Sequence, residues 1–198
     1  MVPKKVTDFL KKQKIPYSLV DHKKVFTAYD AAATLKLKLN EIVKSLVVKM
    51  DKNYYLIALP ADKNLDFGLL KKAAKAMGIA VKKIEIPGEK VITKILKVKP
   101  GQITGFGPLH KIKSVVDTDL KKVKEVIVSG GSLTQSIRMK ISDYLKAIDG
   151  VVAPIGKKKI FVLPKAPQVK KKSTGKKKKL VKKSTKKPGR SRATGKRA

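Results

Sequence analysis

A lysine stands in the middle of the apolar segment Val43–Lys49, which reads VKSLVVK. Burying its ammonium among aliphatic side chains is costly unless the charge reaches water or an anion. Strand alternation places Lys44 opposite Ser45 and on the face of Leu46 and Val48. Two interpretations stay open from these residues. Lys44 binds an anionic group, or it is an edge-strand lysine that reaches solvent and prevents aggregation.

Two glycine-containing segments could offer main-chain N–H groups to an anion or a carbonyl oxygen. The first, Pro100–Gly107 (PGQITGFG), contains Gly101 and Gly105, and the second is Ser129-Gly130-Gly131, which follows an apolar segment. Glycine lets a backbone approach a ligand closely, but it also forms ordinary turns and bulges. The residues alone leave both roles open.

The common enzyme constellations are absent from the sequence. There are two histidines, His22 and His110, each followed by a lysine, and there is no cysteine. The lack of cysteine excludes disulfides and thiolate metal sites. Walker loops, dinucleotide fingerprints and the G-x-S-x-G elbow do not occur either. The sequence therefore predicts neither a metal nor a cofactor.

The chain carries 49 basic and 14 acidic residues, for a formal net charge of +35. Sixteen of the basic residues and no acidic one lie in Lys165–Ala198, which leaves +19 on residues 1–164. A segment with so little apolar surface is predicted to be disordered and to bind a polyanion through counterion release. Nucleic acid is the expected partner.

An anionic membrane is the alternative partner of the basic segment, but no apolar anchor or lipidation motif accompanies the segment. The predicted nucleic-acid contacts are Lys170, Lys171, Lys172, Lys176, Lys177, Lys178, Lys179, Lys182, Lys183, Lys186, Lys187, Arg190, Arg192, Lys196 and Arg197.

Residues 1–164 are predicted to form one domain, because they have an ordinary domain length and enough apolar segments for a core. Helical spacing and capping residues predict helices at Lys4–Lys12, after Thr27 through Leu35, and at Leu65–Met77, Glu89–Leu96 and Ser142–Ile148. Short apolar segments predict strands at Tyr17–His22, Ile42–Met50, Tyr54–Leu59, Val81–Ile86, Ser114–Asp117, Glu125–Ser129, Ser136–Lys140, Val151–Pro154 and Ile160–Leu163, the last two as a pair.

Helices and strands mix without strict alternation along the chain, and hairpins are frequent. This order indicates an α+β fold with a mixed, partly barrel-like β-sheet flanked by helices. No apolar segment approaches the length of a membrane span, and the first ten residues lack the apolar core of a signal peptide. A cytoplasmic protein is expected.

Six segments, taken in order and with their spacing, resemble the YbaK family of trans-editing proteins, which is related to the insertion domain of bacterial prolyl-tRNA synthetases. Members of that family hydrolyse the ester of a tRNA that carries the wrong amino acid. The resemblance therefore implies an aminoacyl-tRNA deacylase, over roughly residues 5–150 and without the basic C-terminal segment. The six segments are His22–Leu37, Val43–Lys49, Leu56–Asp66, Pro100–Gly107, Val115–Asp117 and Val126–Ile137.

The resemblance implies that Lys44 is the family's essential lysine, which holds the phosphate of the terminal adenosine or the aminoacyl group. It also implies that the loop from Gly101 to Gly105, with Ile103 and Thr104, binds the ester carbonyl or the amino acid through its backbone. Gly105 stands where the family has a proline, and a glycine loosens such a loop where proline would stiffen it.

The remaining implied substrate contacts are Ser45, His22, Thr27 and Ser129-Gly130-Gly131. Thr27 also fits a helix N-cap, and His22 also fits an ordinary exposed histidine. Ser45 is more like the serine or threonine of members that act on cysteinyl-tRNA(Pro) than the asparagine of alanine-specific members.

The implied mechanism needs no side-chain nucleophile, because the adenosine's own hydroxyl and a bound water lie beside an activated ester. Apolar side chains near Lys44, Ile103 and Val128 would admit small acyl groups, such as cysteine or alanine on tRNA(Pro), and exclude larger ones. The implied partner is the aminoacylated CCA end of tRNA, with other RNA or DNA on the basic segment and a synthetase as further candidates.

A non-catalytic nucleic-acid-binding protein is the alternative. In that case a deacylase-like body carries a basic segment of histone-like composition. Gly105 in place of proline favours this alternative, whereas Lys44 and Ser129-Gly130-Gly131 favour the hydrolase.

Overall fold

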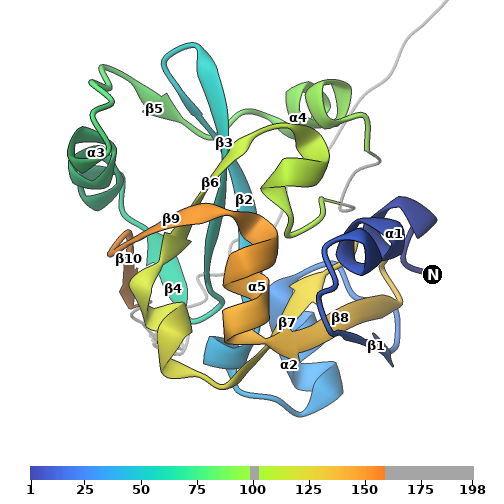
Figure 1. Cartoon of the computed structure of the whole chain (residues 1–198). Coiled ribbons are helices and arrows are strands. Elements are labelled where there is room, and N and C mark those ends of the chain that lie inside the picture. The colour runs from blue at the N-terminus through green and yellow to red at the C-terminus, as the bar shows by residue number, and fades with distance from the viewer. Residues whose placement is uncertain (99–102, 159–198) are drawn as a thin grey trace, which may run out of the picture. The chain divides into compact units, whose positions relative to one another are not determined.

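A five-stranded mixed sheet, in the order β5-β2-β3-β6-β9, forms the centre of the fold (Figure 1). It belongs to a computed structural model that describes residues 1–98 and 103–158. Strands β2 (Val43–Met50) and β3 (Asn53–Pro60), both expected from their apolar segments, form an antiparallel hairpin. Strand β6 (Lys113–Asp117) runs parallel to β3, and β9 (Gly150–Ala153) runs parallel to β6. The two-residue strand β5 (Ile84–Glu85) pairs with the far end of β2.

Two smaller sheets complete the strand arrangement. In the first, β1 (Ser18–Asp21) and β7 (Glu125–Ser129) flank β8 (Gln135–Lys140), and all pairs are antiparallel. In the second, β4 (Lys63–Leu65) pairs with β10 (Gly156–Lys158). A parallel bridge between Ile42 and Ile127 joins the start of β2 to β7. This bridge brings the first small sheet against the entry of the central hairpin.

Helices cover both faces of the central sheet. Helix α5 (Ile141–Ile148) lies on one face and α3 (Phe67–Ala76) on the other (Figure 1). The alternation of β2 explains this, because Val43 and Val47 pack with α5 while Val48 and Met50 pack with α3. The remaining helical segments are α1 (Lys4–Lys12), α2 (Ala28–Leu35), α4 (Glu89–Leu96) and the 3₁₀ turns Leu39–Glu41, Gly107–His110 and Thr118–Lys122.

The predicted α+β class with a mixed sheet is confirmed. Within the described residues the central sheet is open, with β5 and β9 as its edges. The helix after Thr27 begins with a capping box, in which the Thr27 hydroxyl accepts from the Asp30 N–H and the Asp30 carboxylate accepts from the Thr27 N–H. Asp66 caps α3 through the Leu69 N–H. These two helix starts are therefore fixed by local sequence.

Two sequence predictions need correction, and one predicted strand has a partner that was not expected. Ser142 does not cap α5, because β8 continues directly into the helix and the N-cap position falls on Lys140. The segment predicted as Val151–Pro154 forms β9, which pairs with β6. Of the segment Val81–Ile86, only the two residues of β5 are extended. The segment 160–163 and the predicted domain boundary after residue 164 lie outside the described residues.

No helix within the described part of the chain combines the length and the apolar character that a membrane crossing requires.

Candidate active site

A cavity of about 400 Å³ opens beside the start of β2 and the N-terminus of α2. Five of the residues predicted for the site line it together: Thr27, Lys44, Ser45, Ile103 and Ser129. They come from segments spread over more than one hundred residues of sequence. The other lining residues are Val25, Phe26, Ala28, Tyr29, Ala31, Ile42, Val43, Ile127, Ser132, Leu133 and Ser136.

The side chain of Lys44 is half-buried on β2, where its main chain is in register with Leu59 of β3. Its ammonium donates a hydrogen bond to the main-chain carbonyl of Lys63, at the start of β4. A main-chain carbonyl is a suitable hydrogen-bond acceptor for a half-buried ammonium. The hydrogen bond therefore holds a basic side chain in the cavity wall.

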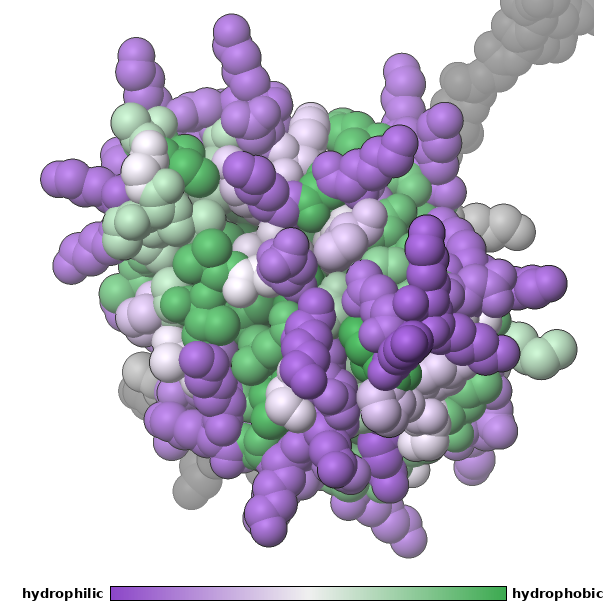
Figure 2. All heavy atoms as spheres, in the orientation of Figure 1, coloured by the Kyte–Doolittle hydropathy of each residue, from purple (hydrophilic) through white to green (hydrophobic). Residues whose placement is uncertain are grey.

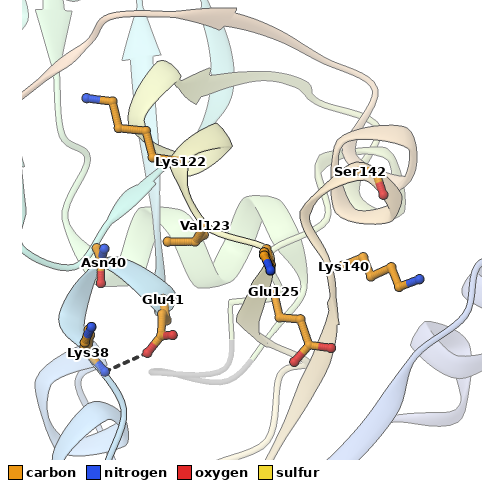
Figure 3. A pocket seen from close by; sticks show the side chains of 9 residues that line it. Lys38, Asn40, Glu41, Lys122, Val123, Glu125, Lys140 and Ser142 are labelled. Atoms are coloured by element: carbon orange, nitrogen blue, oxygen red, sulfur yellow. Dashed lines mark hydrogen bonds between the residues drawn. The ribbon is translucent and has the colours of Figure 1, made fainter.

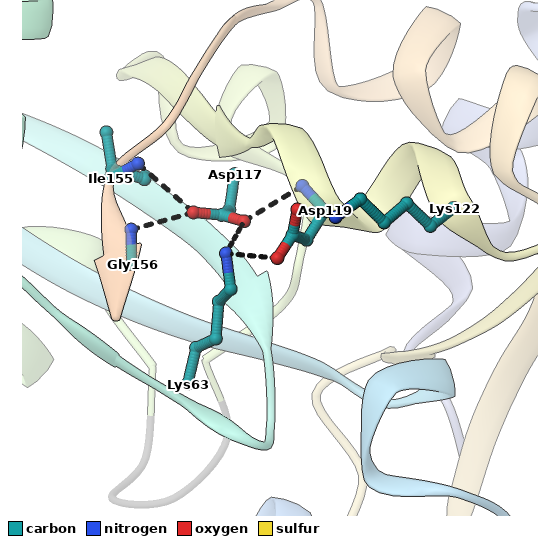
Figure 4. Close-up of polar contacts among 6 residues, drawn as sticks. All are labelled: Lys63, Asp117, Asp119, Lys122, Ile155 and Gly156. Atoms are coloured by element: carbon teal, nitrogen blue, oxygen red, sulfur yellow. Dashed lines mark hydrogen bonds and ion pairs between the residues drawn. The ribbon is translucent and has the colours of Figure 1, made fainter. Parts of the chain in front are cut away.

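The β4 end of this hydrogen bond is itself fixed by a buried ion pair (Figure 4). The Lys63 ammonium lies 2.8 Å from Asp117 Oδ1 and 2.5 Å from Asp119 Oδ2. Burial of Lys63 disfavours its charged form, but the hydrogen bonds to Asp117 and Asp119 outweigh burial and raise the Lys63 pKa. Hydrogen bonds from Lys122 and then Lys63 lower the pKa of Asp119.

Asp117 is fully buried and accepts hydrogen bonds at both carboxylate oxygens. Oδ1 also accepts the Asp119 N–H at 2.9 Å, and Oδ2 accepts the N–H groups of Ile155 at 3.1 Å and Gly156 at 2.7 Å. Asp117 thus connects β6, β4 and β10 (Figure 4). Its contacts mark it as a structural anchor behind Lys44.

Ser45 points to the opposite face of β2 from Lys44, and its Oγ is buried without a hydrogen-bond partner among the described residues. An unsatisfied buried hydroxyl costs about 1–3 kcal/mol. Because Ser45 lines the cavity, a ligand that enters it can supply the missing partner.

Gly105 has a packing role, and its contact with substrate stays a prediction. Its N–H donates to the Ser129 carbonyl at 2.9 Å, and its own carbonyl accepts the Tyr144 hydroxyl at 3.0 Å. A Cβ at this position would lie 2.2 Å from Val128 Cγ1 and 3.3 Å from Ser45 Oγ. Proline would meet Val128 and would also remove the N–H that bonds Ser129. The glycine at this position therefore has a steric reason in this chain.

The Ser129-Gly130-Gly131 segment contributes to the cavity through its serine. The Ser129 hydroxyl donates to the Ile103 carbonyl at 2.9 Å, which fixes the cavity-lining end of the glycine loop. Gly130 pairs with Thr104, and a Cβ there would lie 2.7 Å from Val2 Cγ2. Gly130 is thus needed for the approach of the N-terminal segment, and neither glycine lines the cavity.

His22 and Thr104 lie behind the cavity wall. The His22 ring donates from Nδ1 to the Lys23 carbonyl and contacts the Ser136 hydroxyl through Nε2, both at 2.8 Å. Ser136 lines the cavity, so His22 orients a wall residue. The buried Thr104 hydroxyl instead contacts His110 Nε2 at 2.8 Å, away from the cavity. Burial chiefly, with a smaller effect from Lys5, lowers the pKa of His110.

Among residues 1–98 and 103–158, no three histidine, aspartate or glutamate side chains lie close enough together to hold a metal ion. Gly101 and the predicted contacts from Lys170 to Arg197 lie outside the described residues.

The comparison with protein families matches residues 22–147 to the aminoacyl-tRNA editing domain. This chain belongs to the aminoacyl-tRNA editing domain family. The match contains every described segment that lines the cavity.

Solved structures show the same fold in this editing domain. The hypothetical protein APE2540 is 24% identical with a TM-score of 0.68, and the match covers 78% of this chain and 100% of that protein. A protein described as a candidate trans-editing enzyme for prolyl-tRNA synthetase is 21% identical with a TM-score of 0.65. That match covers 78% of this chain and 96% of the other.

Sequence reasoning missed two features of the editing domain's cavity. Phe26 is 67% exposed at its edge, and the Lys24 ammonium lies 5.1 Å from the centre of the Phe26 ring. An exposed aromatic side chain within a lysine-rich turn is a sequence signal that could have found it. The hydrogen bond from Lys44 to Lys63 carried no such signal, because it joins a side chain to a main-chain atom.

Proposed function

We propose that this editing domain is a hydrolase that deacylates tRNA carrying a wrong, small amino acid. One observation supports this most directly: Lys44 and the unsatisfied Ser45 hydroxyl line the same cavity in a chain of the editing-domain family. The cavity offers a basic side chain and several hydroxyl groups beside apolar side chains. These groups suit the ester of an aminoacyl adenosine, which carries a carbonyl oxygen and a nearby phosphate.

In the proposed reaction, water attacks the ester carbonyl carbon and negative charge develops on the carbonyl oxygen. The Lys44 ammonium stabilises this charge or holds the adjacent phosphate, and Ser45 hydrogen-bonds the bound aminoacyl group. The bond between the carbonyl carbon and the ribose oxygen then breaks, and the ribose oxygen takes a proton. The products are a free amino acid and an uncharged tRNA.

Substrate selection follows from the walls of the cavity. Val43, Ile103 and Ile127 supply apolar surface around a volume of about 400 Å³. A cavity of this kind discriminates by size, because small acyl groups enter and larger ones meet the walls. Phe26 at the edge offers a flat aromatic surface on which an unpaired terminal base can stack.

The test compares Lys44→Ala with Lys49→Ala on a panel of mischarged tRNAs. Both lysines are on β2, but Lys49 pairs with Glu85 at 3.4 Å and does not line the cavity. Lys44→Ala is expected to lower kcat/KM by about 100–1,000-fold, the range for removing one oxyanion-stabilising group. Lys49→Ala should leave it unchanged. Equal turnover by wild type and Lys44→Ala would contradict the proposal.

The non-catalytic nucleic-acid-binding protein is the second candidate, and the basic composition of Lys165–Ala198 favours it. The same panel separates the two. A wild-type protein that binds every tRNA but hydrolyses none would establish the second candidate.

A further inference from the structure

A second depression, of about 760 Å³, lies outside the candidate active site and is lined by lysines (Figure 3). We call Lys38, Lys122, Lys124 and Lys140 with the surface between them the basic groove. They come from the segment before the Leu39–Glu41 turn, from the approach to β7, and from the end of β8. None of them belongs to the cavity that holds Lys44.

The backbone under the basic groove is well fixed. The Lys124 carbonyl accepts the Ile141 N–H at 3.0 Å, which ties the start of β7 to the start of α5. Lys140 is in register with Glu125 on the paired strands β8 and β7. Figure 3 shows Lys122 and Lys140 on opposite sides of Val123 and Glu125. Lys140 therefore lies at the end of a paired strand, and Lys124 lies next to the start of its partner strand.

Carboxylates neutralise part of the charge of the basic groove. Lys122 pairs with Asp119 at 2.7 Å, but no ion pair within the described residues involves Lys38, Lys124 or Lys140. Two carboxylates, Glu41 and Glu125, also line it. Glu41 accepts the Lys38 N–H at 2.8 Å and so stabilises the local turn. With Asp119 counted, four cations face three carboxylates. The remaining positive charge is spread along the sides, which favours an extended anion over a single compact anion at the centre.

The basic groove and the candidate active site are linked by lining residues of a third depression. Glu41 and Glu125 also line a small depression of about 100 Å³, together with Ile127 and Arg138. Ile127 in turn lines the cavity of Lys44. Shared lining residues therefore connect the two sites, and Arg138 adds a further cation between them.

We propose that the basic groove binds the sugar–phosphate backbone near the acceptor end of the tRNA whose 3′ terminus enters the cavity. This inference rests on the proposed deacylase function. Ammonium groups bind phosphates as point charges without reading sequence, and Glu41 and Glu125 can accept hydrogen bonds from ribose 2′-hydroxyls. The groove thereby orients a structured RNA so that its end reaches Lys44.

Site-specific crosslinking gives a direct test, because the chain has no native cysteine. Single variants Lys124→Cys and Lys140→Cys, in the full-length protein, are labelled with a photoreactive group and mixed with uncharged tRNA. The matched control is Lys75→Cys on α3, which covers another face of the central sheet. We expect the two groove positions to crosslink to nucleotides of the acceptor stem. The same crosslinked nucleotides and yields from all three positions would overturn the proposal.

A binding measurement completes the test. The double variant Lys124→Gln/Lys140→Gln is compared with Lys72→Gln/Lys75→Gln, which removes the same charge from α3. If two phosphates are no longer neutralised, the slope of log K against log salt should decrease by about 1.4–1.8, and the control should not change it. Equal slopes for the two variants would reject the groove as an RNA surface and leave an acidic protein as its occupant.

Uncharged tRNA requires no hydrolysis, so these results are independent of the deacylase assay. Acceptor-stem crosslinks in a protein without turnover would support the groove and contradict the proposed function. Normal turnover with no groove-specific crosslink would support the proposed function and contradict the basic groove as an RNA surface.

Discussion

The Lys44 ammonium donates a hydrogen bond to the main-chain carbonyl of Lys63, nineteen residues further along the chain. The Lys63 side chain is in turn held by Asp117 and Asp119. Lys44, in the cavity wall, is therefore positioned by the main-chain carbonyl of Lys63. The side chain of Lys63 is itself held in a buried ion pair. The two lysines have separate tasks, one facing the cavity and the other anchoring β4.

The buried anchor predicts a large loss of stability on removal of Asp117. Asp117→Ala leaves Lys63 with Asp119 alone and removes the acceptor of the Ile155 and Gly156 N–H groups. Breaking a buried pair in this way costs about 3–5 kcal/mol of unfolding free energy, measured by urea denaturation. Asp117→Asn should lose less, since its amide oxygen still accepts. Glu85→Gln, at an exposed ion pair, should change little. Equal losses for Asp117→Ala and Glu85→Gln would contradict the anchor.

Ser45 predicts opposite effects on stability and activity. Ser45→Ala removes a buried hydroxyl that has no partner among the described residues, so thermal denaturation should show an unchanged or higher Tm. If the hydroxyl binds the aminoacyl group, kcat/KM for a mischarged tRNA should fall by about tenfold, equivalent to one hydrogen bond of about 1.4 kcal/mol. A clear drop in Tm with full activity would show that Ser45 is structural.

Replacing Gly105 by alanine is expected to overpack the core, and a second substitution is expected to relieve the overpacking. The new Cβ of Gly105→Ala would lie 2.2 Å from Val128 Cγ1, and forced repacking of this kind costs about 1–3 kcal/mol. Val128→Ala removes the obstructing methyl group. A double-mutant cycle by urea denaturation should therefore give a favourable coupling between the two alanines. If the two losses of unfolding free energy simply add, the contact with Val128 is not the reason why position 105 requires glycine.

His110 predicts a loss of stability on mild acidification. Its pKa in the folded protein lies below the ordinary value of 6.5, chiefly because of burial. Between the folded value and 6.5 the unfolded chain binds more protons, so stability is present above 6.5 and is lost as the pH falls through this window. One proton limits the slope to about 1.4 kcal/mol per pH unit. His110→Gln should flatten the curve of Tm against pH there, and an identical curve would exclude His110 as the cause.

The basic C-terminal segment predicts a salt-dependent contribution to tRNA binding. Replacing residues 165–198 by a Gly/Ser segment of equal length removes sixteen cations while keeping the chain length. KM for tRNA should rise, and the slope of log K against log salt should fall by about 0.7–0.9 for each phosphate that the segment no longer neutralises. The kcat should remain the same, because the cavity is unchanged. An unaltered salt slope would show that the segment does not contribute to tRNA binding.

Local sequence was sufficient to predict those helices and strands that are fixed by residues close together in the chain. The β2–β3 hairpin follows from alternation on either side of a short turn, and α2 follows from the pairing of Thr27 with Asp30. The strand after α5 was found as well, but its partner was not. Alternation tells which side chains share a face, but it does not tell that β9 lies beside β6.

The same limit applies to the candidate site. The sequence placed Lys44 and Ser45 on opposite faces of one strand, and the structure places both along the cavity. It did not reveal that the Gly105 N–H bonds to Ser129 or that Val128 leaves no room for a side chain at 105. These contacts join segments far apart in the chain, and the residue types alone do not predict them.

The last described strand, β10, pairs with the strand that positions Lys44. In the β10–β4 pair, Lys158 stands opposite Lys63, whose carbonyl holds Lys44. If the basic residues that follow in the sequence bind the RNA whose end enters the cavity, one chain holds that RNA at two connected sites. Tethering raises the effective concentration of a ligand, so individually weak contacts are sufficient to return the same RNA to the cavity many times before it escapes.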